Sequence, residues 1–355
     1  MRFLFLTSTP MNIAAGSGTH VGISNLACGL QAAGHQVEVV CDIPQLPNYT
    51  LARWIFNRRL RELDTSSADV VVGFDLDGYR VPRRPGVLHV ASLKGVVADE
   101  ARFESGYTRW SMTRQAAWER QHVHAADLVI TTSEYSAGQA MRLYGLKIKP
   151  AIIPEAIDLS RWQRLLAEAK GESRPELFTV LSVCRFYPRK RLVLLLEAAA
   201  RLRTRIPGMA LRIVGGGPEE KTLHELATRL RLEGVVEWRK DISMSELARE
   251  YAGCDLFCLP SVQEGFGVVF LEAMAAGKAV VAARAGAAPE VVGHGILVEP
   301  ESAEALADGI ERAYREPSLR QRIAEDGLRR VQEFELSRIT GQFLTVVAMA
   351  RATLQ

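Results

Sequence analysis

One segment of the chain reads Cys254-Asp-Leu-Phe-Cys-Leu-Pro-Ser-Val-Gln-Glu-Gly-Phe-Gly-Val-Val-Phe-Leu-Glu-Ala-Met-Ala-Ala-Gly-Lys-Ala-Val-Val281. An apolar run at 256–259 leads through Gly265 and Gly267 into a helical pattern, and a second apolar run begins at Ala279. Strand, glycine turn, helix and strand in this order predict parallel strands joined by a helix. The segment therefore indicates an α/β fold, with a loop at the glycines where the backbone can approach a ligand closely.

The same alternation extends in both directions from this segment. Buried strands are expected at 3–7, 36–41, 70–73, 87–91, 128–132, 179–184, 211–214, 235–238, 256–259 and 279–282. Helices are expected at 21–33, 110–126, 192–204, 219–230, 245–251, 270–276 and 336–353. Strand–helix alternation in both halves predicts two Rossmann-like, doubly wound parallel-sheet domains that face each other across a cleft.

The length of 355 residues suits two domains of ordinary size. The less regular stretch 150–174 is interpreted as the linker. We expect an N-terminal domain over 1–160, with the last helix in 336–355 packing back on it, and a C-terminal domain over 175–335.

Bulk composition excludes several classes. The net charge of +3 implies no nucleic-acid partner. The sequence has no apolar run of about 18 residues, so no membrane-spanning helix is expected, and the short apolar start does not resemble a signal peptide. The five scattered cysteines are typical of reduced core thiols. A cytoplasmic protein is expected.

Two loops carry features of an anion site. In the first, Gly16 and Gly18 precede a helix whose N-terminal N–H groups attract anions, although a capped glycine turn explains the same residues. In the second, Arg185 and Lys190 flank a turn directly after a strand and supply a fork and a point charge for phosphate. The alternative for the second loop is an ordinary solvated basic turn.

The third loop contains a spaced pair of carboxylates. Seven residues separate Glu264 from Glu272, and Gly265 and Gly267 lie between them. Carboxylates can accept hydrogen bonds from the neighbouring hydroxyls of a sugar. Glu272 would alternatively be a surface helix residue, but its apolar surroundings make an unpartnered carboxylate there costly.

The segment 254–281 closely resembles the family-4 retaining glycosyltransferases of the GT-B fold, in which a Glu-x7-Glu pattern marks the donor site. Further resemblance lies, in the expected order, at 125–133, 153–158, 185–190, 214–219 and 286–292. The resemblance implies a glycosyltransferase that moves a sugar, with retention, from a nucleotide diphosphate-sugar to an unidentified glycan, lipid-linked or small-molecule acceptor.

The resemblance also implies a role for each matching residue. Arg185 and Lys190 would hold the donor diphosphate, and Glu272 would bind the ribose hydroxyls. Glu264 would hold the transferred sugar, together with backbone amides of the turn. The donor-binding backbone positions implied by the resemblance are Gly16, Gly18, Gly265, Phe266, Gly267 and Val268. The departing phosphate itself would act as the base, so that stabilising this leaving group is the main catalytic task.

No metal and no other cofactor are expected, because cations and dipoles already neutralise the diphosphate. Asp75-Leu-Asp77 matches the Asp-x-Asp pattern of a metal-binding motif, but the resemblance gives it no such role. Three dipeptides depart from the family pattern: Lys94-Gly95 stands for His-Gly, Glu155-Ala156 for Asn-Gly, and Gly286-Ala287 for a glycine pair. Lys94 could donate a hydrogen bond to a sugar hydroxyl or to an anionic acceptor, and His20 is a second candidate contact.

The segment Leu51-Ala-Arg-Trp-Ile-Phe-Asn-Arg-Arg-Leu-Arg61 mixes aromatic and basic side chains. Such a helix can lie on an anionic leaflet, which suggests peripheral contact with the inner face of the membrane. An ordinary amphipathic helix that covers the sheet is the alternative, and the one that we favour.

Other function classes fit less well. A nicotinamide dehydrogenase would need a third glycine at Val21 or Glu220, where neither turn has one. A nucleotide-sugar epimerase of similar fold gives no reason for the pair Glu264 and Glu272. A non-catalytic protein that binds nucleotide-sugars remains the runner-up.

Overall fold

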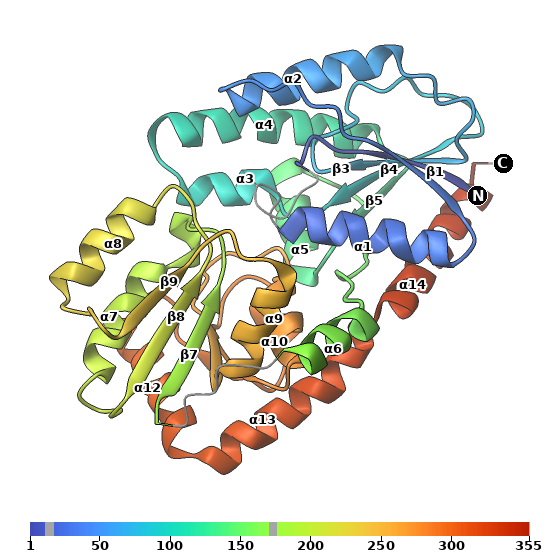
Figure 1. The fold of residues 1–355 in the computed structure, drawn as a ribbon. Coiled ribbons are helices and arrows are strands. Elements are labelled where there is room, and N and C mark those ends of the chain that lie inside the picture. Colours follow the sequence, from blue (N-terminus) through green and yellow to red (C-terminus); the bar gives the residue numbers. More distant parts are fainter. Residues whose placement is uncertain (11–17, 170–175, 355) are drawn as a thin grey trace. The chain divides into compact units, whose positions relative to one another are not determined.

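The computed structural model describes residues 1–10, 18–169 and 176–354. The chain divides into two compact units: unit 1 comprises Met1–Ala156 and Leu336–Gln355, and unit 2 comprises Ile157–Glu335. Each unit is a parallel sheet with helices packed on it (Figure 1). The predicted fold class, two doubly wound α/β domains, is confirmed.

Unit 1 has the strand order β2-β1-β3-β4-β5-β6. Its strands are β1 (Arg2–Leu6), β2 (Gln36–Val40), β3 (Val70–Phe74), β4 (Leu88–Leu93), β5 (Leu128–Thr131) and β6 (Ala151–Ile152). Its helices are α1 (Gly18–Ala32), α2 (Tyr49–Arg59), α3 (Val97–Glu100), α4 (Gly106–Ala125), α5 (Glu134–Tyr144) and α14 (Leu336–Ala352), with the 3-10 turns η1 (Leu60–Glu62) and η2 (Ala101–Phe103). The chain runs from β1 to one neighbour and then to the other, so the topological switch point lies between β1 and β3.

Unit 2 has the strand order β12-β11-β10-β7-β8-β9. Its strands are β7 (Phe178–Val183), β8 (Met209–Val214), β9 (Val236–Arg239), β10 (Leu256–Leu259), β11 (Ala279–Ala283) and β12 (Ile296–Val298). Its helices are α6 (Leu159–Glu168), α7 (Leu192–Leu202), α8 (Glu220–Arg229), α9 (Met244–Gly253), α10 (Val268–Ala275), α11 (Ala288–Val292), α12 (Ala303–Arg315) and α13 (Pro317–Arg330), with η3 (Pro188–Lys190) and η4 (Val331–Phe334). The switch point lies between β7 and β10.

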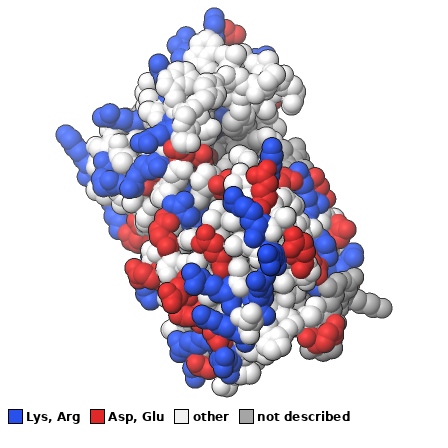
Figure 2. Space-filling model, turned by 90° about the vertical axis from the view of Figure 1, so that its left-hand side faces the viewer, with Lys and Arg blue, Asp and Glu red and all other residues white. Residues whose placement is uncertain are grey.

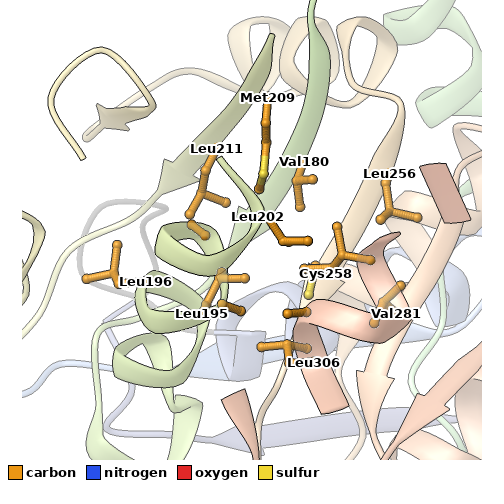
Figure 3. Packing of buried hydrophobic residues seen from close by; sticks show 14 of the residues in the cluster. Val180, Leu195, Leu196, Leu202, Met209, Leu211, Leu256, Cys258, Val281 and Leu306 are labelled. Carbon is orange, nitrogen blue, oxygen red and sulfur yellow. The ribbon is translucent and has the colours of Figure 1, made fainter. Parts of the chain in front are cut away.

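The core of unit 2 explains why its strands are apolar throughout. Strands covered on both faces bury successive residues, and every residue of β8, β10 and β11 is buried. Figure 3 shows Leu195 and Leu202 of α7 directed at Val180 and Cys258 of the sheet, with Leu306 of α12 beside them. This packing fixes the loops at the ends of the central strands.

The last helix of the chain, α14, belongs to unit 1 and packs on α1. The ring of Phe343 lies 6.0 Å from that of Phe3, centroid to centroid. A side chain at Gly29 of α1 would stand 2.0 Å from Thr340 Oγ1, so the close approach of the two helices depends on a glycine there.

The prediction that 150–174 is an irregular stretch is wrong, because it contains helix α6. The side chain of Asp158 caps it by accepting the Arg161 N–H at 2.8 Å, and the apolar Leu159 and Trp162 are buried. The glycine and proline that suggested a linker follow the helix instead of interrupting it. Strands β6 and β12 were not predicted, because two or three residues are too few to show a period.

Candidate functional site

The candidate site in unit 2 lies at the carboxyl ends of β7 and β10, the neighbouring strands at the switch point. Arg185 and Lys190 follow β7, and Glu264 follows β10. Doubly wound sheets bind ligands in this position, outside the carboxyl ends of the strands where the strand order reverses. Lys190 and Glu264, 74 positions apart in the chain, thereby come together.

Backbone hydrogen bonds join the loops that follow four strands of this sheet. The Phe186 N–H donates to Gly216 O at 3.1 Å, and the Val262 N–H donates to Arg189 O at 2.9 Å. The Ala287 N–H donates to Glu264 O at 3.0 Å. The loops after β7, β8, β10 and β11 therefore form one hydrogen-bonded layer.

Two glycines are required by the close contacts within this layer. A Cβ at Gly217 would stand 2.7 Å from the Phe186 nitrogen. Gly286 has φ +57°, and a Cβ there would stand 2.6 Å from the Glu264 nitrogen. Only glycine fits these positions without a shift of the backbone. Gly286, the first residue of a departure from the family pattern, thus supports the loop of Glu264.

Lys190 and Glu264 form an ion pair at the centre of the layer. Lys190 Nζ donates to Glu264 Oε1 at 2.6 Å. Their side chains are only 13% and 8% exposed, so water screens the pair little. The pair places a cation and a carboxylate together, which suits a ligand with an anionic part and a hydroxylated part.

Helix α10 begins directly after the glycine turn. Gly267 is its N-cap and has φ +95°, in the left-handed region that glycine adopts without strain. The helix start at Val268 directs a positive dipole end toward the site. Phe266 is buried, and its ring packs 5.5 Å from that of Phe334, so its side chain has a structural role and only its backbone faces the turn.

Glu272 lies in α10 and is buried, so the surface-helix alternative is wrong. Tyr251 of α9 donates its hydroxyl proton to Glu272 Oε2 at 2.8 Å. Burial raises the pKa of Glu272 to about 7, against the opposing effect of the Tyr251 hydrogen bond. The indole N–H of Trp162 donates to Glu272 O at 3.1 Å, which fixes the backbone of the helix here.

Two polar residues of this region were missed by sequence reasoning. Tyr251 lies in an expected helix, and nothing in its spacing pointed to Glu272. Ser261 follows β10, and its buried hydroxyl has no hydrogen-bond partner among the described residues. A serine directly after a strand at a switch point is a signal that could have been used.

The chemistry of the remaining groups is limited. Burial raises the pKa of the Cys184 and Cys254 thiols to about 12, so both stay protonated at neutral pH and neither is a ready nucleophile. Among residues 1–10, 18–169 and 176–354, no group of three or more His, Cys, Asp or Glu side chains could hold a metal ion.

The predicted site residues of unit 1 have different environments. Gly16 lies outside the described residues, and Gly18 is the first residue of α1, three positions before the expected start. His20, in α1, has its Nδ1 atom 3.3 Å from the hydroxyl oxygen of Ser24. Lys94 follows β4 and pairs with Glu155, Nζ to Oε1 at 2.9 Å. The two residues that depart from the family pattern most clearly therefore contact each other.

The carboxylate of Asp77 is bound by other residues of unit 1. It accepts hydrogen bonds from the backbone N–H of Ser8 at 2.6 Å and from Asn57 Nδ2 at 2.8 Å, and Arg53 lies 3.3 Å away. Arg53 is buried, and the aromatic Phe56 of the same helix is buried too. These two side chains of the segment 51–61 therefore pack inward, as the favoured interpretation of an amphipathic helix that covers the sheet requires.

Both halves of the chain match known protein families. Residues 164–330 match the family described as glycosyl transferases group 1, and residues 16–161 match the one described as glycosyltransferase family 4. The two matched regions together span nearly all of residues 16–330, so both halves of the chain belong to glycosyltransferase families. The resemblance of segment 254–281 to family-4 glycosyltransferases is thereby confirmed.

A relative within this family illustrates the similarity. The chain is 31% identical, over 236 residues, to a GDP-mannose-dependent alpha-(1-6)-phosphatidylinositol monomannoside mannosyltransferase of Mycobacterium tuberculosis. The match covers 62% of this chain and 60% of that relative. The chain thus spans well under the full length of the curated relative that it matches.

Solved structures of glycosyltransferases share the GT-B fold with this chain. Sucrose-phosphate synthase from Thermosynechococcus elongatus superposes with a TM-score of 0.83 at 20% identity, covering 99% of both chains. HepE from Anabaena, solved with UDP and glucose, gives a TM-score of 0.73 at 22% identity, covering 98% of this chain and 100% of that one. None of the helices among the described residues has the length and hydropathy of a membrane span.

Proposed function

We propose that this chain transfers a sugar, with retention of configuration, from a nucleoside diphosphate-sugar to a hydroxyl of an acceptor. The observation that carries the proposal is the Lys190–Glu264 ion pair at the β7/β10 switch point, 2.6 Å between Nζ and Oε1. A diphosphate needs cations, and a sugar needs carboxylate acceptors for its hydroxyls. The pair brings one of each to the place where such sheets bind nucleotides.

Each site residue has a role in this proposal. Lys190 and Arg185 neutralise the diphosphate, together with the helix α10 dipole and the amides of Gly265 to Val268. Glu264 accepts hydrogen bonds from the transferred sugar. Glu272 accepts them from the ribose and is held in place by Tyr251.

The chemical step balances without an added base. The bond from the anomeric carbon to the β-phosphate oxygen breaks, and the acceptor oxygen bonds to the same face of that carbon. The acceptor proton passes to the departing phosphate oxygen, because both glutamates are already engaged with hydroxyls. Negative charge grows on the diphosphate in the transition state, and preoriented cations there lower the barrier. The reaction needs no divalent metal, because these cations do the neutralising.

A transfer assay tests this function. The purified chain is incubated with UDP-, GDP- and ADP-sugars and an acceptor extract, and free nucleoside diphosphate and the anomeric configuration of the product are measured. We expect one donor to release diphosphate only with acceptor present, and the product to keep the donor's configuration. A product of inverted configuration would refute retention. Tight donor binding without any release of diphosphate would favour the non-catalytic alternative. Release of an epimerised donor would favour the epimerase.

Peripheral attachment to a membrane is a second proposal, supported by an exposed patch on unit 1. The patch combines large apolar side chains of the loop before α2, of α2 and of the start of α4: Leu46 (40% exposed), Tyr49 (43%), Leu51 (46%), Tyr107 (63%) and Trp110 (54%). Asn48 Nδ2 donates to the Tyr107 hydroxyl at 2.8 Å, and this hydrogen bond links the N-terminal ends of α2 and α4.

The charge around this patch fits an anionic lipid surface. Helix α2 contains no acidic residue, and the one carboxylate of α4, Glu119, is fully buried. Arg58, Arg59, Arg109 and Arg114 are exposed. In Figure 2 the upper part of the face is mainly white with blue and a little red at its edges, whereas blue and red side chains intermingle below. Amphipathic aromatic and basic side chains bind at this interface, and the inner face of the cytoplasmic membrane is the proposed location.

Vesicle cosedimentation tests the attachment. We expect binding to vesicles with anionic phosphatidylglycerol and not to neutral phosphatidylcholine. Binding should fall on the substitution Arg58→Glu/Arg59→Glu and on Trp110→Ser. The matched control Arg201→Glu/Arg229→Glu changes exposed arginines of unit 2. Equal binding of all variants would end the proposal.

A further inference from the structure

The carboxyl edge of the sheet in unit 1 is a second place that can receive a ligand. Its switch point lies between β1 and β3, and the residues that follow these strands include Ser8 and Asp75. Lys94 follows the next strand, β4, and Glu155 follows β6. Ligands bind at such edges. If unit 2 holds the donor, as proposed above, this edge is where the acceptor binds, and the inference below rests on that function.

Lys94 and Glu155 are fixed to each other at this edge. Lys94 Nζ lies 2.9 Å from Glu155 Oε1 and 3.1 Å from Oε2, so one ammonium contacts both carboxylate oxygens. The side chains are 9% and 5% exposed, and the ammonium lies 5.6 Å from the centre of the Phe74 ring. Gly22 of α1 makes room for the pair, because a Cβ there would stand 2.1 Å from Glu155 Oε2.

Asp75 adds a further carboxylate beside the pair. It has φ +53°, a conformation that non-glycine residues rarely adopt and that gathers at ligand sites. Its Oδ1 accepts the Lys94 N–H at 2.8 Å. Burial raises the pKa of Asp75 to about 6, Arg53 opposes this, and Asp77 and Glu100 add to it. The carboxyl group therefore stands among other acidic groups.

The charges at this edge leave no cation for an anionic ligand. Within the described part of unit 1, Lys94 is matched by Glu155, and Arg53 is matched by Asp77 at 3.3 Å. Burial lowers the pKa of His20, which keeps its imidazole neutral at pH 7. The edge therefore carries paired cations together with an excess of carboxylate.

We propose that the acceptor presents a neutral polyhydroxyl group to unit 1, and that the Lys94–Glu155 pair selects it over phosphorylated or carboxylated groups. Hydroxyls can donate to Asp75 and Glu155 and accept from Lys94 without disturbing the pair. A phosphate would draw Lys94 away and leave the buried Glu155 carboxylate without its partner, which is strongly unfavourable. Its own charge would also meet Asp75.

The test compares two probe pairs, glucose with glucose 6-phosphate and myo-inositol with myo-inositol 1-phosphate. Binding to the full chain is measured by calorimetry with saturating nucleoside diphosphate, which occupies the cations of unit 2. For the wild type we expect the phosphorylated probe to bind no more tightly than its neutral partner. The variant Glu155→Gln keeps the shape of the side chain and frees the Lys94 charge, and the phosphorylated-to-neutral affinity ratio should rise at least tenfold.

A double variant, Lys94→Met/Glu155→Gln, removes both charges and should return the ratio to the wild-type value, with circular dichroism confirming the fold of each variant. The proposal is overturned if the wild type prefers the phosphorylated probe tenfold or more, if Glu155→Gln leaves the ratio unchanged, or if no probe binds to either protein. Failure of the proposed function has another signature, since no donor would then release nucleoside diphosphate in the transfer assay described above.

Discussion

Lys190 and Glu264 depend on each other, because each is the other's partner in a largely buried pair. Removing one partner of a buried ion pair leaves the second charge without compensation and costs about 3–5 kcal/mol of stability. Turnover and stability must therefore be measured separately in any variant of this pair.

We predict that Lys190→Ala lowers kcat by about 10²- to 10³-fold, the equivalent of about 2.7–4 kcal/mol, because a preoriented donor to the departing diphosphate is lost. Turnover is measured with saturating donor at a temperature well below the melting point of the variant. Lys221→Ala is the control, since Lys221 is 90% exposed and lies on the surface of α8. A kcat within twofold of the wild type would remove Lys190 from the mechanism.

We predict that donor binding depends on pH through the protonation of Glu272. Its pKa is raised to about 7, and only its ionised form accepts hydrogen bonds from both ribose hydroxyls. Since protonation competes with binding, the affinity should be full at pH 8 and about tenfold lower at pH 6, one unit below the pKa. A nucleotide-sugar is used in calorimetry because its diphosphate does not titrate in this range.

The same titration with Glu272→Gln should be nearly flat, at an affinity below that of the wild type at pH 8. A wild-type affinity that is independent of pH between 6 and 8 would contradict the ribose role of Glu272.

At the scale of elements, the layer of loops depends on backbone conformations that only glycine adopts easily. Gly267 begins α10 with φ +95°, and Gly286 lies under the Glu264 loop with φ +57°. A left-handed conformation costs a non-glycine residue about 1–2 kcal/mol, before any clash is counted.

We predict that Gly286→Ala lowers the melting temperature by at least several degrees, because a domain of this size loses about 2–4 °C per kcal/mol. Donor affinity should fall as well, since the new Cβ would press on the Glu264 backbone at 2.6 Å. The matched control is Gly341→Ala in α14, where no atom lies within 4 Å of a Cβ and alanine favours the helix. Differential scanning calorimetry compares the two, and equal melting temperatures would contradict the account.

The elements could be predicted from sequence where they are long and periodic. The strands predicted at 256–259 and 279–282 are present as β10 and β11. Lys190 and Glu264 meet because parallel strands end at one edge, a property that the alternation already implied. The Lys94–Glu155 contact could not be predicted, because 61 positions separate the residues and no local pattern relates them.

At the scale of the whole molecule, the chain leaves unit 1 after Ala156 and returns to it at Leu336. Helix α14 contributes Ile339, Phe343 and Val347 to the core of unit 1. The folding of unit 1 therefore requires residues from both ends of the sequence.

We predict that Phe343→Ala destabilises unit 1 by about 3–5 kcal/mol, the usual cost of truncating a buried phenylalanine. Phe343 is 1% exposed, whereas Met349 of the same helix is 68% exposed and Met349→Ala serves as the control. Hydrogen exchange should accelerate in β1 and β3 and not in β7 and β10. Uniform acceleration in both sheets would show that α14 does not act on unit 1 specifically.

The central claim is that unit 2 binds a nucleoside diphosphate through the loops after β7 and β10. Its most direct test is the melting temperature of the wild type and of Arg185→Ala/Lys190→Ala with UDP, GDP and ADP. A ligand that binds only the folded state stabilises it by RT ln(1 + [L]/Kd). We predict that at least one nucleotide raises the melting temperature of the wild type and leaves that of the double variant unchanged. An equal rise in both proteins, or no rise in the wild type, would show that these loops do not bind a nucleoside diphosphate.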